Sequence, residues 1–327
     1  MSSYFSNTII KSPQDLITTR EQTRAGFIEA ALEKNRKSKP FIENAKTLKN
    51  YASLAKTPID LLHIPQIRKG LLTASGLSDK SLHYFTDTDK EEAIKKMIEE
   101  FLIPAGDFFV DELVYRYLLI SGDTLGGTMR NLVGSIAKMK VIRKLLSVMN
   151  LMQIDYLIIM KDDKKNFSWN RYDYEFAYER VEEIYAIRWK YNNIVKVLFF
   201  DTTLPIVSKN VDICLYDSTG CSFDTDFIRA RNDRAIMLGE LKGGIDPAGA
   251  DEHWKTGNSA LGRIRTAFGN KGYNVHTSFI AAAIEKEMAK EIYNQLVEGV
   301  LSNAINLTYD NHLIHYCEWV IKLEKKK

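Results

Sequence analysis

The chain has 327 residues, 45% of them hydrophobic and 27% charged, which is the composition of an ordinary globular protein. The 45 basic and 42 acidic residues leave a formal net charge of +3, which excludes no class of partner, because a local basic groove matters more than the total. No apolar run approaches the roughly 20 residues that a membrane-spanning helix needs, so we expect no membrane segment. The three cysteines lack paired spacing, which argues against a disulfide framework or a structural zinc site and favours the cytoplasm.

The first part of the chain has the apolar periodicity of helices. Thr18 and Thr19 can cap a helix with apolar positions from Phe27 to Leu32. Further helices are predicted over 87–104, 108–120 and about 129–149, with a glycine-rich break at 121–127.

From about residue 150 the pattern changes to short apolar runs typical of buried strands. Strands are predicted over 156–160, 194–200, 211–216, 235–242, 277–284 and 312–321, and helices over 174–191 and 251–268. A further amphipathic helix is predicted with Met288, Ile292, Leu296 and Val300 on one face. We therefore predict an α/β protein with two domains, a mainly helical one over 1–135 and an α/β catalytic core over 136–327.

Two of the predicted strands carry the residues with the clearest chemical implication. Asp212 lies in the first, and the second ends in Glu240-Leu241-Lys242. Side chains at i and i+2 of a strand point to the same side, so Glu240 and Lys242 share one face. If the strands are neighbours, Asp212 joins them, and two carboxylates can hold a hard divalent cation such as Mg²⁺. The lysine can stabilise phosphate charge, which suits phosphodiester cleavage. The alternative is a surface hairpin with a salt bridge.

The segment after Lys242 leaves the strand through glycines and a proline turn and enters the predicted helix over 251–268. His253 lies near the start of that helix, where a histidine can deprotonate water, or else cap the helix or pack in the core. The helix also carries polar residues that can line a phosphate-binding face or form a solvated surface: Lys255, Asn258 and Arg263.

Two further features suit contacts with an anion or with DNA bases. Gly122–Asn131 is a second glycine-rich segment before a predicted helix, whose backbone amides can hold an anion, although it lacks the Gly-Lys-Ser/Thr ending of a P-loop. Asp246 and Lys209 flank the acids in sequence, and an acid can accept from cytosine while a lysine donates to guanine. Turn capping and surface charge explain these residues equally well.

These motifs together resemble those of the type II restriction endonucleases in the PD-(D/E)XK superfamily, and more closely the AvaI/BsoBI group. The resemblance is carried by Val211-Asp212, by the block 239–256 and by the glycine-rich segment 122–127. The block 239–256 is much more specific than the superfamily motif alone. Val211 stands where the superfamily's name expects a proline.

The resemblance implies a nuclease core with a mixed central sheet flanked by helices, and Mg²⁺-dependent cleavage of both DNA strands at C-Y-C-G-R-G with a 5′ overhang. It also implies a homodimer that surrounds double-stranded DNA, with the helical region helping to close around the duplex, and a companion DNA methyltransferase.

The resemblance also implies roles for residues at matching positions. Asp212 and Glu240 would be metal ligands, together with the backbone carbonyl of Leu241. Lys242 would be the catalytic lysine and His253 a candidate general base. Asp246 and Lys209 are the best candidates for reading bases, and Lys80, in a turn of the helical region, is a weaker one.

Three other functions remain compatible with the sequence. A repair or junction-resolving nuclease would use the same core but recognise DNA shape. A DNA-binding protein without activity would use the acids structurally. A hydrolase of small phosphoesters would need no DNA.

Overall fold

The computed structural model of the chain describes residues 9–163, 168–221 and 223–326, without the side chains of residues 129–133. The chain divides into two compact units. One is a helical unit over Ile28–Leu132, and the other is an α/β unit that contains the rest of the described chain, including the N-terminal segment up to Phe27.

The helical unit is built from α1 (Arg20–Ala52), α2 (Arg68–Ala74), α3 (Asp87–Met97) and the first part of α4 (Phe109–Leu151), joined by short 3-10 and π-helical turns. The predicted start of α3 is confirmed: the Thr86 hydroxyl accepts from the Asp89 amide, and the Asp89 carboxylate accepts from the Thr86 amide. Such a reciprocal cap satisfies two backbone donors that the helix leaves free. The core of the unit is apolar and includes Leu48, Leu71, Ile94, Ile98 and Leu113.

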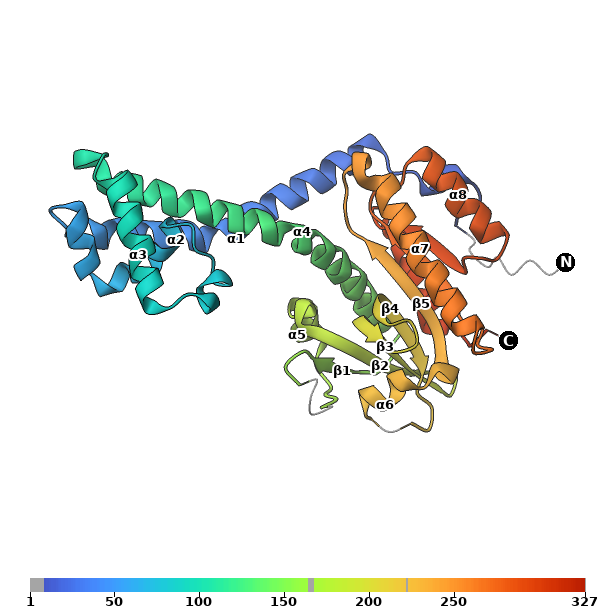
Figure 1. Cartoon of the computed structure of the whole chain (residues 1–327). Coiled ribbons are helices and arrows are strands. Elements are labelled where there is room, and N and C mark those ends of the chain that lie inside the picture. The colour runs from blue at the N-terminus through green and yellow to red at the C-terminus, as the bar shows by residue number, and fades with distance from the viewer. Residues whose placement is uncertain (1–8, 164–167, 222, 327) are drawn as a thin grey trace. The chain divides into compact units, whose positions relative to one another are not determined.

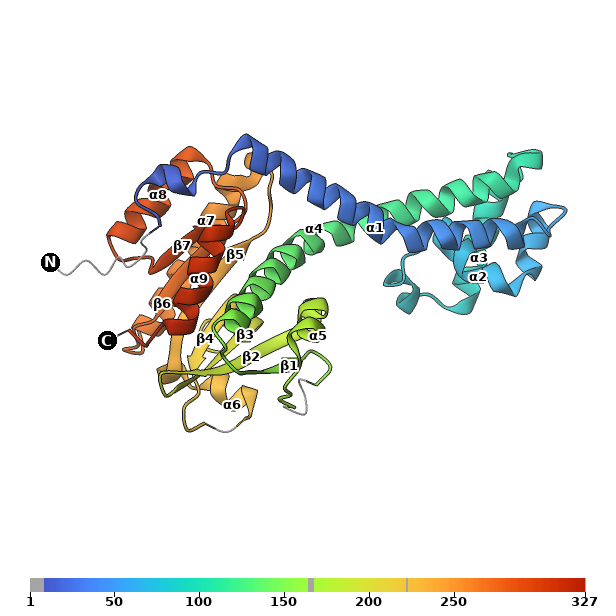
Figure 2. The same ribbon diagram turned by 180° about the vertical axis from the view of Figure 1, so that it is seen from behind.

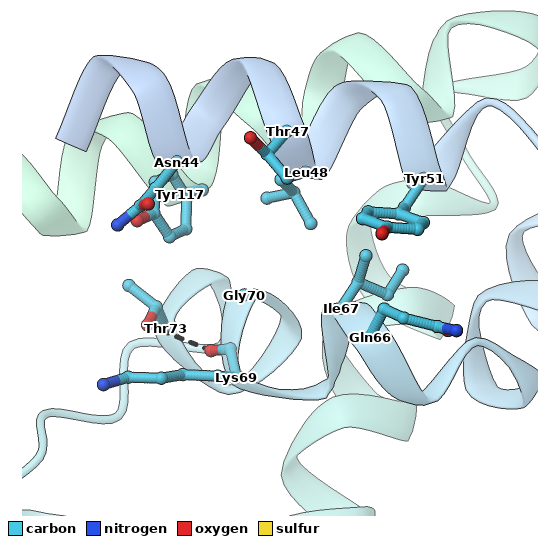
Figure 3. A pocket seen from close by; sticks show the side chains of 10 residues that line it. All are labelled: Asn44, Thr47, Leu48, Tyr51, Gln66, Ile67, Lys69, Gly70, Thr73 and Tyr117. Atoms are coloured by element: carbon cyan, nitrogen blue, oxygen red, sulfur yellow. Dashed lines mark hydrogen bonds between the residues drawn. The ribbon is translucent and has the colours of Figure 1, made fainter. Parts of the chain in front are cut away.

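A cavity of about 260 Å³ lies in this unit between α1 and the segment that leads into α2 (Figure 3). Gly70 lets the two helices approach, because a Cβ at this position would lie 2.8 Å from Leu48 Cδ1. The lining is polar and apolar in equal parts, and it contains none of the residues predicted for a site: Asn44, Thr47, Leu48, Tyr51, Gln66, Ile67, Lys69, Gly70, Thr73 and Tyr117.

A single sheet forms the centre of the α/β unit. Within the described residues it has seven strands in the order in which they occur in the chain: β1 (Tyr156–Met160), β2 (Ile184–Tyr191), β3 (Ile194–Leu204), β4 (Lys209–Asp217), β5 (Ala235–Lys242), β6 (His276–Ala281) and β7 (Asn303–Asn306). Strands β1 to β5 pair antiparallel, whereas β5, β6 and β7 pair parallel. The parallel pairs need helical crossovers, and these are α7 (Ala250–Gly269) and α8 (Lys286–Val297).

Helices cover both faces of the sheet (Figures 1 and 2). Helices α7 and α8 pack with one apolar cluster, on what we call the α7 face. The C-terminal part of α4 and helix α9 (Asp310–Lys322) pack with a second cluster, on the α4 face. Two small helices, α5 (Tyr174–Glu179) and α6 (Thr225–Ala230), lie in the connections around the sheet. The predicted α/β architecture with a mixed sheet flanked by helices is confirmed.

The predicted break at 121–127 is wrong, since α4 runs through it without interruption. A glycine inside a helix weakens it by about 1 kcal/mol relative to alanine, but the buried positions Leu113, Tyr117 and Leu125 keep the helical period on both sides of Gly122. The proposed anion-binding turn at Gly122–Asn131 is therefore also wrong, because amides in the middle of a helix bond to its own carbonyls.

Two further predictions of secondary structure are wrong. The predicted helix 174–191 is helical over α5 and a 3-10 turn at Val181–Glu183, and its second half is β2, which pairs on both sides with β1 and β3. The predicted last strand, 312–321, is helix α9, whose buried residues recur with helical spacing: His312, Leu313, Tyr316, Cys317, Val320 and Ile321. The short strand β7 was not predicted.

No helix in the described parts of the chain combines the length and the apolar character that crossing a bilayer requires. The three cysteines are free: Cys214 and Cys317 are buried and Cys221 is partly buried.

Candidate active site

The pairing of β4 with β5 brings the two predicted acids together. Ile213 pairs with Gly239 in the antiparallel ladder, so Asp212 and Glu240 are the next residues on either strand and lie opposite each other. The Leu241 amide donates to Asp212 Oδ2 over 2.8 Å. This bond turns the Asp212 carboxylate toward β5 and fixes one of its two oxygens.

Lys242 lies on the same face as Glu240, as the spacing predicts. Its Nζ donates to Glu240 Oε2 over 3.0 Å, and the Glu240 residue is only 4% exposed. The lysine stem passes under α7 at a glycine, since a Cβ at Gly257 would lie 3.4 Å from Lys242 Cε. The sheet and α7 therefore hold the lysine from both sides.

Both acids are disfavoured as anions in this setting. Burial, and after it the charge of Asp212, raise the pKa of Glu240 to about 7, although Lys242 opposes the shift. Burial also raises the pKa of Asp212, while the Leu241 amide and Lys242 lower it. Two neighbouring carboxylates that repel each other, one buried and one partly buried, fit a divalent cation, whose charge would favour both anions.

The backbone of Leu241 adds an oxygen on the same side. The Lys242 carbonyl accepts from the Ala282 amide over 2.9 Å, so it points toward β6. Successive carbonyls of a strand alternate in direction, so the Leu241 carbonyl points toward β4 and Asp212. Among the described residues, no group of three or more His, Cys, Asp and Glu side chains is arranged to hold a metal. Mg²⁺ is commonly bound by one or two carboxylates and completes its shell with water, so this donor set suits it.

The loop from β5 to α7 brings His253, in the first turn of α7, close to the end of β5 that carries Glu240 and Lys242. Its partly buried imidazole lies against the glycines of this loop: a Cβ at Gly244 would lie 2.6 Å from His253 Nε2, and one at Gly249 would lie 3.5 Å away. Gly244 is two residues beyond Lys242, so the loop ties the position of the histidine to the end of β5.

The candidate DNA-binding residues have mixed surroundings. Asp246 is exposed and caps the following turn by accepting from the Ala248 amide over 3.0 Å. On α7, Lys255 pairs with Asp251 at 2.5 Å. The Asn258 side-chain oxygen accepts from Gln295 Nε2 on α8 over 3.2 Å.

Three other basic candidates are exposed. Arg263 extends from α7, and its charge helps to lower the pKa of Glu240. Lys209 begins β4, on the same strand as Asp212. Lys80 lies in the helical unit, where it precedes a 3-10 helix, and is thus not part of the α/β unit that carries the acids.

The sequence prediction missed an ion pair beside the acids. Asp201 on β3 pairs with Lys138 on α4, and the charges of both affect the pKa of Asp212. A signal was present, since Asp201 directly follows the apolar run 194–200. Lys138 could not have been recognised, because only the packing of α4 on the sheet brings it near.

Comparisons with known proteins identify the family of this chain. A family model described as "Restriction endonuclease BsobI" matches residues 6–323. The chain is 48% identical over 314 residues to the type II restriction enzyme BsoBI of Geobacillus stearothermophilus, covering 96% of this chain and 97% of the relative. It is 45% identical over 315 residues to the type II restriction enzyme AvaI of Nostoc sp. (strain PCC 7120), covering 96% and 98%, and the AvaI enzyme of Anabaena variabilis matches equally well. The chain therefore belongs to the BsoBI family of restriction endonucleases and is a type II restriction enzyme.

Proposed function

We propose that this enzyme hydrolyses both strands of double-stranded DNA at a short symmetric site in a Mg²⁺-dependent reaction. The observation that carries the proposal is the arrangement of two facing carboxylates, the buried Glu240 and the partly buried Asp212, with Lys242 donating to Glu240. The recognition site that we propose is C-Y-C-G-R-G, cut to leave a 5′ overhang.

Asp212, Glu240 and the Leu241 carbonyl would hold the Mg²⁺ ion. When bound, the ion supplies Lewis acidity at the scissile phosphate and lowers the pKa of water. The observation in favour of this assignment is the crowding of two carboxylates whose pKa values are raised, because a cation removes the repulsion between them.

The side chains of this chain then divide the remaining work. The Lys242 ammonium, held in place by Glu240 and α7, stabilises the negative charge that develops on the phosphate. His253 takes the proton from the attacking water. The water oxygen would form a bond to phosphorus while the bond from phosphorus to the 3′ oxygen breaks. The departing 3′ oxygen would take a proton from solvent, leaving a 5′-phosphate and a 3′-hydroxyl.

The proposed DNA contacts come from the surroundings of this centre. Asp246 and Lys209 would read bases, with Lys80 as a weaker candidate, and Lys255, Asn258 and Arg263 would contact phosphates. A two-fold symmetric site calls for a C2 homodimer with one active centre for each strand. We also propose that a companion DNA methyltransferase protects the host's own sites.

The first test is digestion of phage DNA with purified enzyme in Mg²⁺ and in EDTA, followed by sequencing of the product ends. We expect discrete Mg²⁺-dependent fragments that share one symmetric site. Glu240→Ala and Lys242→Ala should lower the cleavage rate by about 100-fold or more, while both variants still bind the site in Ca²⁺. Lys290→Ala, which removes an exposed lysine paired with Glu287 on α8, is the matched control and should cut normally.

The same experiment separates the other functions. Cleavage of branched but not linear duplexes would indicate a structure-specific nuclease. Site-specific binding without turnover under any metal would indicate a DNA-binding protein. Full activity of Glu240→Ala would remove that residue from the mechanism.

A further inference from the structure

Asp201 lies directly opposite Asp212 in the pairing of β3 with β4. The pairs on either side of it are Phe200 with Ile213 and Thr202 with Val211. Asp201 has a φ of 49°, in the left-handed region that side chains other than Asn and Asp rarely adopt. A strand residue with this φ interrupts the regular pattern in which successive side chains point to opposite faces of the sheet.

Both strands change face at this pair. Phe200 packs on the α4 face, and alternation would keep Leu204 on that face, but Leu204 packs on the α7 face. On β4, Ile213 packs on the α4 face, whereas Val211, two residues away, packs on the α7 face. The change of face therefore falls at Asp201 on one strand and at Asp212 on the other.

Lys138 holds Asp201 at this point from the α4 face. Its Nζ forms an ion pair with Asp201 Oδ2, and the lysine side chain is only 10% exposed, compared with 52% for the aspartate. A lysine buried to this extent needs a partner, and Asp201 supplies it. The pair therefore links α4, which packs on the sheet, to the irregular residue of β3.

The ion pair also acts on Asp212 electrostatically. The charges of Asp201 and Lys138 both lie within electrostatic range of the Asp212 carboxylate. The irregularity in β3 and the charges of the ion pair thus both act on Asp212, a residue of the proposed active centre.

We propose that Asp201, anchored by Lys138, is a positioning residue for Asp212. The pair fixes the irregularity in β3 that lets β4 turn the Asp212 carboxylate toward the Leu241 amide and Glu240. The inference rests on the proposed function in one respect, the role of Asp212 as a metal ligand. Neither Asp201 nor Lys138 is expected to touch the DNA or the ion.

The test uses Lys138→Met and Asp201→Asn in the full-length enzyme. Methionine keeps the apolar length of the buried lysine, and asparagine tolerates the left-handed conformation, so both variants should fold. We expect the Leu241 amide to exchange its hydrogen faster in both. We also expect Mn²⁺ binding without DNA, followed by electron paramagnetic resonance, to weaken by about 10- to 100-fold, the usual effect of removing an outer-shell partner.

Lys144→Met is the matched control, because it removes another α4 lysine from an ion pair, with Asp310 at 3.6 Å. Hydrogen exchange at Leu241 and Mn²⁺ affinity should stay at the parent values. Asp201→Gly tests the anchor separately, since glycine permits the left-handed conformation but leaves Lys138 without its partner to hold it. It should resemble Lys138→Met.

Unchanged Leu241 exchange and Mn²⁺ affinity in both Lys138→Met and Asp201→Asn would overturn the inference, even if their melting temperatures fell. Asp212→Asn reports on the proposed function separately. If that variant binds Mn²⁺ as well as the parent does, Asp212 is not a ligand, and the proposed function fails whatever Asp201 does.

Discussion

Glu240 combines two properties that rarely occur together in a carboxylate, near-complete burial and a second acid directly opposite. Lys242 compensates only partly, because the pKa of Glu240 still rises to about 7. This arrangement therefore lowers the stability of the folded protein when no cation is present. This is the pattern expected where a ligand supplies the missing charge.

The cost at Glu240 can be measured through its dependence on pH. The raised pKa means that the folded protein keeps a proton between the ordinary value of 4.5 and about 7, where the unfolded chain has released it. The contribution of Glu240 to the free energy of unfolding therefore falls as pH rises through that window. In EDTA at about pH 8, the free energy of unfolding of Glu240→Gln should exceed that of the parent by about 1 kcal/mol or more, and near pH 4 the two free energies should be equal. Denaturant titration at both pH values measures the difference. A difference that is the same at both pH values would contradict this assignment.

The role of His253 can be tested through the glycines beside it. Gly244→Ala would place a Cβ 2.6 Å from His253 Nε2, so the imidazole must move, whereas Gly249→Ala would make only an ordinary contact at 3.5 Å. We expect Gly244→Ala to lower the single-turnover cleavage rate as much as His253→Ala does, typically about 100-fold, and Gly249→Ala to cleave like the parent. Normal cleavage by both His253→Ala and Gly244→Ala would exclude the histidine as the base.

Among the elements, α7 packs closely on β5 and β6, and this close approach depends on one position. A Cβ at Gly257 would lie 2.6 Å from Phe279 Cε2 on β6 and 3.4 Å from Lys242 Cε. Gly262, one and a half turns further along the same helix, has only the end of the Arg265 side chain nearby, at 4.0 Å. The same substitution at these two glycines should therefore have opposite effects.

Gly257→Ala should destabilise the protein by about 1–3 kcal/mol, because a well-packed interface must open to admit the methyl group. It should also slow cleavage, since Lys242 lies in that interface. Gly262→Ala should stabilise the protein by about 0.5–1 kcal/mol through helix propensity alone. Urea unfolding of the two variants measures both effects. Equal stabilities of Gly257→Ala and Gly262→Ala would show that α7 can shift to admit the methyl group without destabilising the protein.

How far the sequence predicts the elements depends on how local their determinants are. Strand β5 and helix α7 could be predicted because their apolar periods agree with their local propensities. The second half of 174–191 is a strand because β1 and β3 pair with it, which is a non-local cause. In α9 the buried residues recur with the helical period, but the same residues also form an apolar run of the kind that predicts a buried strand. The predicted domain boundary near residue 135 stays a prediction.

The candidate site divides in the same way. The spacing of Glu240 and Lys242 within one strand places them on one face, and this could be read from the sequence. That Asp212 lies opposite Glu240 depends on the register of β4 against β5, which the sequence left conditional. The ion pair of Lys138 with Asp201 joins residues 63 positions apart, so no local pattern predicts it.

On the scale of the whole molecule, the proposed dimer has one active centre for each DNA strand. Mixed dimers of the parent and Asp212→Asn would then contain one working centre, since asparagine can still accept from the Leu241 amide but supplies no charge for a cation. Differently tagged subunits, refolded together and purified by both tags, should nick a supercoiled plasmid with one site and accumulate the open circle, whereas the parent dimer linearises it. Mass measurement of the parent should give twice 37.5 kDa. A monomeric mass, or linear product made by mixed dimers as fast as by the parent, would mean that each strand is not assigned to its own subunit.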